Sequence, residues 1–268
     1  KTELLFFCII SLLFSSYPCL AIEENPAWER AGWDLVWHDE FDGKSIDGSK
    51  WTVRDYGDVR NNELQYYTPE EVYIENGNLV IRSQKRRFKD KRYTSGRLET
   101  RDKFYIQYGY FEIRAKLPET KGIWAAHWMM PQDRVWPPEI DITECLGQEP
   151  DRIYFAYHYG DPAAPLEKST SYKNKTPFAD AFHTFALEWT EDSLTWYVDG
   201  KQRFQVKREE VTQFPEKPFY MILNTAVGGT WPGNPNKNTV FPQYHSIDYV
   251  RIYQKTPDPS VDDFLLYD

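Results

Sequence analysis

Cysteine is scarce in this chain of 268 residues, and the three cysteines present cannot cross-link a folded domain. Cys8 and Cys19 fall in or at the edge of an N-terminal segment that we expect to be removed, which leaves Cys145 alone in the mature protein. An intrachain disulfide is then impossible, so stability has to come from a hydrophobic core. The remaining length suffices for one large all-β domain.

Long hydrophobic runs are also missing. The apolar run from Leu4 to Phe14 is too short to span a bilayer, and no later run is long enough, so no membrane span is expected. A lysine precedes this run and the small residue Ala21 follows it, which predicts a signal peptide over residues 1–21 and a secreted protein, extracellular or periplasmic. Lipid anchoring through Cys19 is the alternative, although Tyr17-Pro18 matches such a site poorly.

Positive charge is in deficit, with 32 Lys and Arg against 41 Asp and Glu and a net charge of −9. Phosphate binding needs a surplus of Lys and Arg, so a nucleic-acid partner is not expected, and a heavily sulfated polysaccharide is mildly disfavoured. Solubility explains the acidic balance equally well. The 10 Trp and 19 Tyr exceed what a core of this size needs, which favours flat aromatic surfaces on which sugar rings stack.

Helical periodicity is limited to a short stretch near Arg208 to Phe214, and period-two alternation dominates instead. Asp199-Gly200 predicts a hairpin turn, because a type I′ turn needs positive φ at both central positions. The alternation and the turns between the runs predict an antiparallel sandwich or barrel in one domain, 22–254, with a loosely attached tail, 255–268. The predicted strands lie around Leu35, 79–82, 111–117, 124–130, 140–145, 153–159, 184–189, 194–198, 220–226 and 247–253.

The acidic segment WPPEIDITECLG carries the chemistry that we predict. Glu139 and Asp141 are two apart and share one face of a strand, whereas the odd offset of Glu144 needs a β-bulge near Ile142-Thr143 to return it to that face. Retaining glycoside hydrolysis needs a nucleophilic carboxylate and a proton donor about 5–5.5 Å apart. With a third carboxylate beside them, one of the three should keep a proton near neutral pH, and this is the proton that Glu144 would deliver as general acid.

The spacing alone decides little. Acidic residues number 41 of 268, so three at any fixed spacing are expected roughly once per chain by chance. The same three carboxylates could also form a cation site. The apolar flanks and the nearby aromatic residues suit a sugar better than an ion.

Segments spread over most of the chain add the specificity that the acidic triplet lacks. They are WDLVWHDEFDG, NNELQYYT, YTSGRLET, YGYFEIRAKLP, GIWAAHWMMP, WPPEIDITECLG, FHTFALEWTEDSLTWYVDG, NTAVGGTWPG and IDYVRIYQ. In these segments the chain resembles glycoside hydrolase family 16, and within it the laminarinase-like β-glucanases, the group of endo-β-1,3-glucanases and licheninases. The resemblance implies a β-jelly-roll of two curved antiparallel sheets, concanavalin A-like, with an open substrate cleft. It also implies a retaining double displacement with Glu139 as nucleophile, Asp141 as supporting carboxylate and Glu144 as acid/base.

The resemblance also implies residues that hold the sugar and a metal. No cofactor is expected for catalysis, but a structural calcium ion is, bound by backbone oxygens of Glu40 and Gly77 and by the carboxylate of Asp248. A buried aspartate bonded to backbone amides explains Asp248 almost as well. Pro137-Pro138, His127 and Thr143 depart from the usual pattern and put substrate preference in doubt. The expected substrate-binding residues are Asn62, Glu63, Arg97, Trp124, Trp128, His158, Asn224 and Trp231.

These features predict a secreted, monomeric, endo-acting enzyme that cleaves β-1,3-glucan or mixed-linkage β-1,3-1,4-glucan. A transglycosylase, which passes the glycosyl group to a sugar, would look alike in sequence. A galactan hydrolase of the agar or carrageenan type is a further alternative. A non-catalytic glucan-binding protein of the same fold is disfavoured because both glutamates are present.

Overall fold

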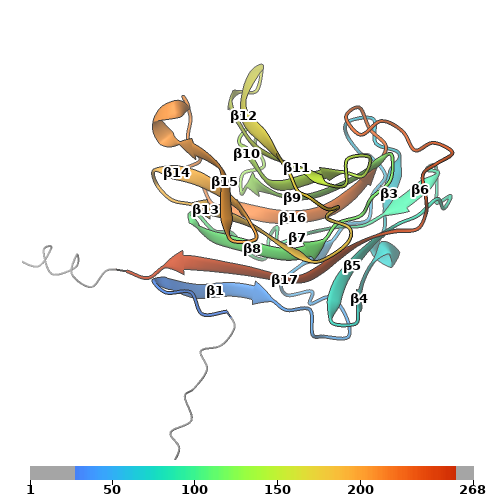
Figure 1. Ribbon diagram of the computed structural model, residues 1–268, viewed down its shortest axis with the longest axis horizontal. Helices are drawn as coiled ribbons and strands as arrows, with labels where there is room; N and C mark the ends of the chain where they lie inside the picture. The colour runs from blue at the N-terminus through green and yellow to red at the C-terminus, as the bar shows by residue number, and fades with distance from the viewer. Residues whose placement is uncertain (1–27, 258–268) are drawn as a thin grey trace, which may run out of the picture.

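The computed structural model describes residues 28–257 and consists almost entirely of β-strands. The predicted signal peptide, with Cys8 and Cys19, and the last residues of the predicted tail lie outside the described residues. Figure 1 shows two curved sheets stacked on each other, as the jelly-roll prediction requires. In residues 28–257, no helix is long and apolar enough to cross a membrane.

The outer sheet has eight strands in the order β15-β14-β13-β8-β17-β5-β4, with β1 also paired to β17. All of its pairings are antiparallel. Its strands are β1 (Trp33–Asp39), β4 (Val72–Glu75), β5 (Asn78–Ser83), β8 (Gly109–Lys116), β13 (His183–Trp189), β14 (Ser193–Val198), β15 (Lys201–Lys207) and β17 (Gln243–Lys255).

The cleft sheet has seven antiparallel strands in the order β12-β11-β10-β9-β16-β7-β2. In Figure 1 the β11–β12 hairpin rises at one side of this sheet. Its strands are β2 (Thr52–Val53), β7 (Arg97–Glu99), β9 (Ile123–Pro131), β10 (Glu139–Leu146), β11 (Arg152–Asp161), β12 (Ala164–Lys173) and β16 (Phe219–Val227).

Smaller elements complete the fold. A third sheet pairs β3 (Gln65–Tyr67) with β6 (Tyr93–Ser95) in parallel, which the expectation of purely antiparallel pairing missed. Two 3₁₀ turns are present, η1 (Pro69–Glu71) and η2 (Arg208–Glu210). The short stretch of helical periodicity near Arg208 to Phe214 contains one three-residue turn, η2, because those residues connect two strands.

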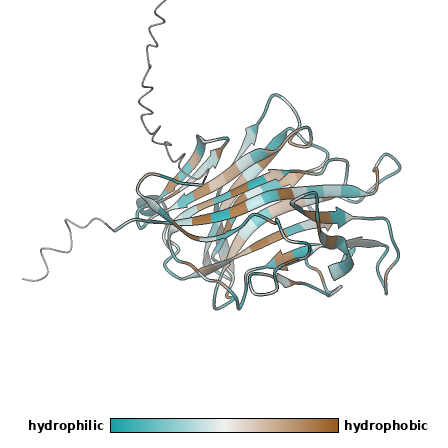
Figure 2. Cartoon of the chain, turned by 90° about the horizontal axis from the view of Figure 1, so that it is seen from below, coloured by the Kyte–Doolittle hydropathy of each residue, from teal (hydrophilic) through white to brown (hydrophobic). Residues whose placement is uncertain are grey.

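The core lies between the two large sheets and follows the predicted alternation. In β8, Phe111, Ile113 and Ala115 are fully buried, whereas the intervening polar side chains are only partly buried. Figure 2 shows hydrophobic and hydrophilic residues alternating along the strands in this way. Cys145 is buried in this core as a free thiol.

The predicted hairpin turn between β14 and β15 is present. Asp199 and Gly200 both have positive φ, 49° and 69°, the combination that a type I′ turn requires. Asp199 tolerates this conformation because its short polar side chain can bond locally, and its carboxylate accepts hydrogen bonds from Thr184 and His183.

Candidate active site

Strand β10 presents three carboxyl groups to one face of the cleft sheet. Glu139, Asp141 and Glu144 all line the cleft above this sheet. Ile140 and Ile142 point the other way and are completely buried in the core. The strand therefore has one acidic face and one apolar face, despite the odd spacing between Glu139 and Glu144.

A β-bulge makes this arrangement possible. In the ladder with β9, Asp141 lies opposite Trp128 and Thr143 lies opposite His127, so β10 contains one extra residue between these pairs. The bulge predicted near Ile142-Thr143 is thus confirmed. At the bulge, the carbonyl oxygen of Asp141 accepts a hydrogen bond of 2.8 Å from the indole N–H of Trp196, in β14 of the outer sheet. The bulge is thereby held from across the core.

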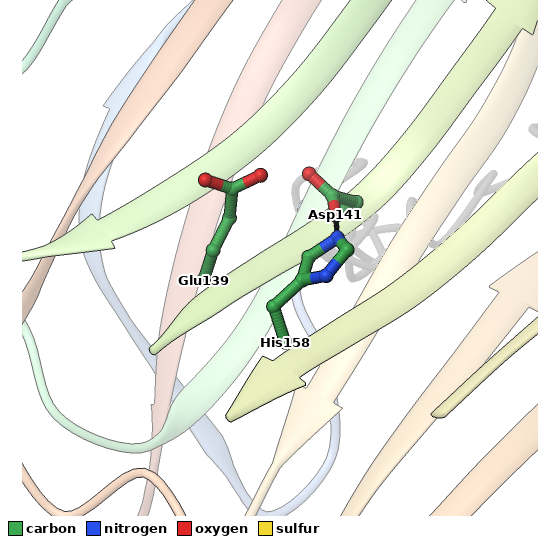
Figure 3. Close-up of side chains that lie close together, drawn as sticks. All are labelled: Glu139, Asp141 and His158. Carbon is green, nitrogen blue, oxygen red and sulfur yellow. Dashed lines mark ion pairs between the residues drawn. The ribbon is translucent and has the colours of Figure 1, made fainter. Parts of the chain in front are cut away.

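His158 in β11 lies beside the acidic face. It stands opposite Glu139 in the β10–β11 ladder, and its Nε2 is 3.1 Å from Oδ2 of Asp141, as Figure 3 shows. Its Nδ1 is 3.5 Å from Oε2 of Glu167 in the edge strand β12. Burial by itself would lower the pKa of His158, but the contact with Asp141 and the charges of Glu139 and Glu167 raise it to about 9. The ring is therefore an imidazolium at neutral pH.

The three carboxyl groups hold protons more tightly than free acids do. Burial raises the pKa of Glu139, and the charge of Asp141 raises it further, to about 8, although His158 opposes the change. Burial also raises the pKa of Asp141, again opposed by His158. The pKa of Glu144 lies well above 4.5 because of burial and of the charges of Asp141 and Glu139. The expected shared proton therefore has a physical basis, and the groups titrate together.

The alternative of a cation site finds less support in this geometry. The donor atoms that lie within 4.8 Å of one another belong to Glu139, Asp141 and His158, and Glu144 is not in this group. A histidine binds metal only as the neutral ring, whereas the raised pKa keeps His158 protonated. The group is better described as an imidazolium paired with carboxylates.

The cleft above β10 has a volume of about 1190 Å³ and is lined by aromatic side chains. The indole N–H of Trp124 donates to Oε1 of Glu144 at 3.0 Å. Trp231 meets the edge of Trp124, with ring centroids 5.4 Å apart, and also packs against Tyr154. Trp231 is 41% exposed, and Trp128 lines the same cleft, so flat ring surfaces of the predicted type are available to a sugar.

A polar network occupies the cleft beyond β9. The indole N–H of Trp128 donates to the side-chain oxygen of Asn224 at 2.7 Å, and the amide of Asn224 donates to the hydroxyl of Tyr67 at 3.1 Å. Tyr67 in turn contacts Glu63, and the guanidinium of Arg97 lies 4.9 Å from the ring centre of Trp128. These contacts hold the predicted binding residues in fixed orientations.

Asn62 is the predicted binding residue that does not line the cleft. Its side-chain amide donates to the hydroxyl of Thr230 at 3.1 Å, and its neighbour Asn61 lines the cleft instead. The other seven predicted binding residues all line the cleft.

Several cleft residues were not predicted. Trp136 is the first residue of the acidic segment, three positions before Glu139, and that position was an available signal. Glu167 lies in β12, whose mostly exposed, polar sequence lacks hydrophobic alternation and gave no signal. The charged residues Arg54, Glu99 and Arg101, at the far edge of the sheet, also line the cleft and were not predicted.

The residues of the predicted calcium site lie around one point of β17. Strand β1 pairs with β17 from residue 250 onward and β5 pairs with it up to residue 247, so Asp248 lies at the gap that Glu40 and Gly77 flank. This placement fits the predicted ligands from the backbone, which are the carbonyl oxygens of Glu40 and Gly77. However, the carboxylate of Asp248 is paired with Arg114, and that of Glu40 with Arg251. The calcium site stays a prediction.

Comparisons with known proteins agree with this geometry. The family model of the glycosyl hydrolases family 16 matches residues 61–251. The chain is 37% identical over 247 residues to a β-glucanase of Rhodothermus marinus. This match covers 83% of this chain and 85% of that protein. It is 34% identical over 264 residues to glucan endo-1,3-beta-glucosidase A1 of Niallia circulans, but this match spans only 38% of that protein and 84% of this chain.

A solved structure is similar over its whole length. The laminarinase catalytic domain from Thermotoga maritima superimposes with a TM-score of 0.79 at 39% sequence identity, covering 84% of this chain and 99% of that domain. At this identity the similarity concerns the sequence as well as the fold.

Proposed function

The chain belongs to glycosyl hydrolase family 16, and from this premise we propose that it hydrolyses internal bonds of β-1,3-glucan or mixed-linkage β-1,3-1,4-glucan with retention of anomeric configuration. The bulged strand β10 carries this proposal, because it brings Glu139, Asp141 and Glu144 to the floor of an aromatic cleft. The similar β-glucanase and endo-glucosidase support the choice of a glucan.

The roles follow from the environment of each carboxyl group. Glu139 attacks the anomeric carbon, while Glu144 gives its proton to the departing glycosidic oxygen. In the second step Glu144 removes a proton from water, which attacks the anomeric carbon and releases Glu139. The raised pKa of Glu144 suits a group that must be protonated at the start of each cycle.

Asp141 and His158 support the nucleophile without touching the bond that breaks. The imidazolium of His158 stabilises negative charge on Asp141 and Glu139 and so opposes the effect of burial on their pKa values. Activity should rise with pH as Glu139 loses its proton and fall when Glu144 loses its own. A bell-shaped profile with alkaline-shifted limbs follows.

We also propose that the protein is secreted and monomeric. The predicted signal peptide over residues 1–21 supports secretion.

The release of reducing ends from a panel of laminarin, lichenan, xyloglucan, agarose and carrageenan tests the substrate. We expect oligosaccharides of several lengths from laminarin or lichenan at the earliest times, as internal cleavage produces. Proton NMR of the first products should show the β-anomer before mutarotation. Initial release of the α-anomer, or activity confined to the galactans, would refute the proposal.

A further inference from the structure

Arginine side chains cluster at the edge of the cleft sheet farthest from β12. Arg97 in β7 contacts Oε1 of Glu99 at 2.8 Å, Arg101 contacts Oε2 at 3.2 Å, and Nε of Arg54 lies 3.6 Å from Oε1. A backbone hydrogen bond from Arg54 to Arg97 fixes the two residues side by side. We call Arg54, Arg97 and Arg101 the arginine cluster, and all three line the cleft.

The charges in this region do not balance. Three guanidinium groups share the single buried carboxylate of Glu99. The next carboxylate, Asp102, contacts Arg134 with both oxygens at 3.0 Å and reaches Arg101 only at 4.0 Å. Four arginines thus meet two carboxylates. Glu63 also lines the cleft, but no ion pair joins it to the arginines in residues 28–257.

One donor in the arginine cluster is also unsatisfied. The Nε atom of Arg54 is buried and has no hydrogen-bond partner within the part of the chain that the structure describes, and the same is true of the Oε2 atom of Glu99. A buried N–H group without an acceptor is costly, and an arginine presents its donors in a geometry that suits carboxylate and sulfate oxygens. One arginine suffices to neutralise Glu99. Of the other positive charges, that of Arg97 also interacts with Glu63, and the guanidinium of Arg54 lies 5.4 Å from the ring centre of Tyr56, so the cluster keeps a surplus of positive charge beside the cleft.

The position of the cluster relates it to the bound polysaccharide. The register places Asp141 opposite Trp128, Trp128 opposite Ile222, and Ile222 opposite Glu99. Three strand spacings therefore separate the catalytic strand from Glu99, or about 14 Å at the usual spacing between strands. A sugar chain that crosses the sheet from β10 over Trp128 reaches the arginine cluster a few sugar units from the bond that is cut.

We propose that the arginine cluster is a subsite for an anionic substituent of the polysaccharide, a carboxylate or a sulfate ester. This inference rests on the proposed glucanase function for the backbone of the substrate and adds an acidic group that a plain β-glucan lacks. It also qualifies the expectation from net charge, because the chain as a whole is acidic while this end of the cleft is basic.

Rates on matched glucans test the proposal. We would measure kcat/KM for unmodified, lightly carboxymethylated and lightly sulfated β-1,3-glucan with wild type and with the double variant Arg54→Gln/Arg101→Gln. Loss of charge-assisted hydrogen bonds should lower kcat/KM on an anionic glucan about tenfold more than on unmodified glucan. Comparison of the two anionic glucans decides between carboxylate and sulfate.

A matched control and a binding measurement complete the test. Arg208→Gln removes an exposed arginine that pairs with Glu216 outside the cleft, and it should change neither rate. Calorimetry measures the binding of the same glucans to the Glu139→Gln protein, with and without the arginine changes. This measurement does not depend on turnover. If the double variant does not fold, Arg101→Gln alone serves, because Arg54 and Arg97 still pair with Glu99.

The outcomes separate this inference from the proposed function. Hydrolysis of unmodified glucan with no preference for either anionic glucan, or a preference that survives the arginine changes, overturns the subsite and leaves the function standing. Arginine-dependent binding of an anionic glucan without hydrolysis of any glucan supports the subsite and overturns the function. Equal binding of all three glucans overturns the subsite in either case.

Discussion

Replacing His158 with glutamine should expose the electrostatic role of its imidazolium. Its pKa in the folded protein is about 9, compared with 6.5 for a free histidine. At about 1.4 kcal/mol for each tenfold change in proton affinity, this difference corresponds to a net stabilisation of the protonated ring by about 3 kcal/mol, which remains after the cost of burial is subtracted from the interaction with Asp141, Glu139 and Glu167. Because the folded-state pKa is raised, the stabilisation is fully present below about pH 6.5 and is lost as the pH rises through about 9.

The same change should alter the pH dependence of activity. Without the imidazolium, Asp141 and Glu139 hold their protons to higher pH. Burial raises their pKa values, and the positive charge of His158, which lowers them, is then absent. The acid limb of the kcat/KM profile should therefore move upward by roughly one pH unit. At neutral pH a smaller fraction of the enzyme then has an ionised nucleophile, and kcat should fall.

Urea unfolding at several pH values between 6 and 10 measures the effect on stability. The pH–rate profiles on the best glucan measure the effect on activity. The stability difference between wild type and His158→Gln should approach about 3 kcal/mol near pH 6 and shrink toward pH 10. His183→Gln is the control, because His183 also contacts an aspartate, Asp199, but lies in the outer sheet. A stability difference that does not vary with pH, together with an unmoved acid limb, would refute the reasoning.

Further predictions concern four other side chains. Glu139→Gln should lower kcat by several orders of magnitude while the circular dichroism spectrum is retained, and near-normal turnover would disprove its role. Glu144→Ala should still react with an aryl glycoside that has a good leaving group, and azide should restore turnover and give the β-azide; an α-azide would exchange the two roles. Trp196→Phe leaves the Asp141 carbonyl without its partner, so urea unfolding should show a loss of about 1–3 kcal/mol, and unchanged stability would contradict this. If Asp248 binds calcium, chelator should lower the Tm of wild type but not of Asp248→Asn, and an unchanged wild-type Tm would remove the site.

Strand prediction succeeded where one face of a strand is buried and failed at the edges of the sheets. The residues of β8 alternate because every second side chain enters the core. Strand β12 has mostly exposed side chains and so carries no such alternation, although it forms ten pairs with β11. The two- and three-residue strands β2, β3, β6 and β7 are too short to show any period.

The catalytic strand shows how far local sequence can reach. Ile140 and Ile142 marked the buried face, and the odd offset of Glu144 required a bulge, which β10 contains. The segments that resemble family 16 then assigned the roles of Glu139 and Glu144. Neither spacing nor resemblance predicted that Trp196 would bond to the bulge from the opposite sheet.

The all-β class, the apolar and acidic faces of β10 and the β14–β15 turn could be predicted from the sequence, because each depends on residues that are neighbours along the chain. Which distant side chains share an environment depends on the folded arrangement of the strands. Glu167 reaches His158, and Trp196 reaches Asp141 from 55 residues away. The arginine cluster likewise depends on the pairing of β2 with β7. Such contacts depend on strand order and register, which place residues opposite one another, and side-chain pKa values then follow from burial and charge at those positions.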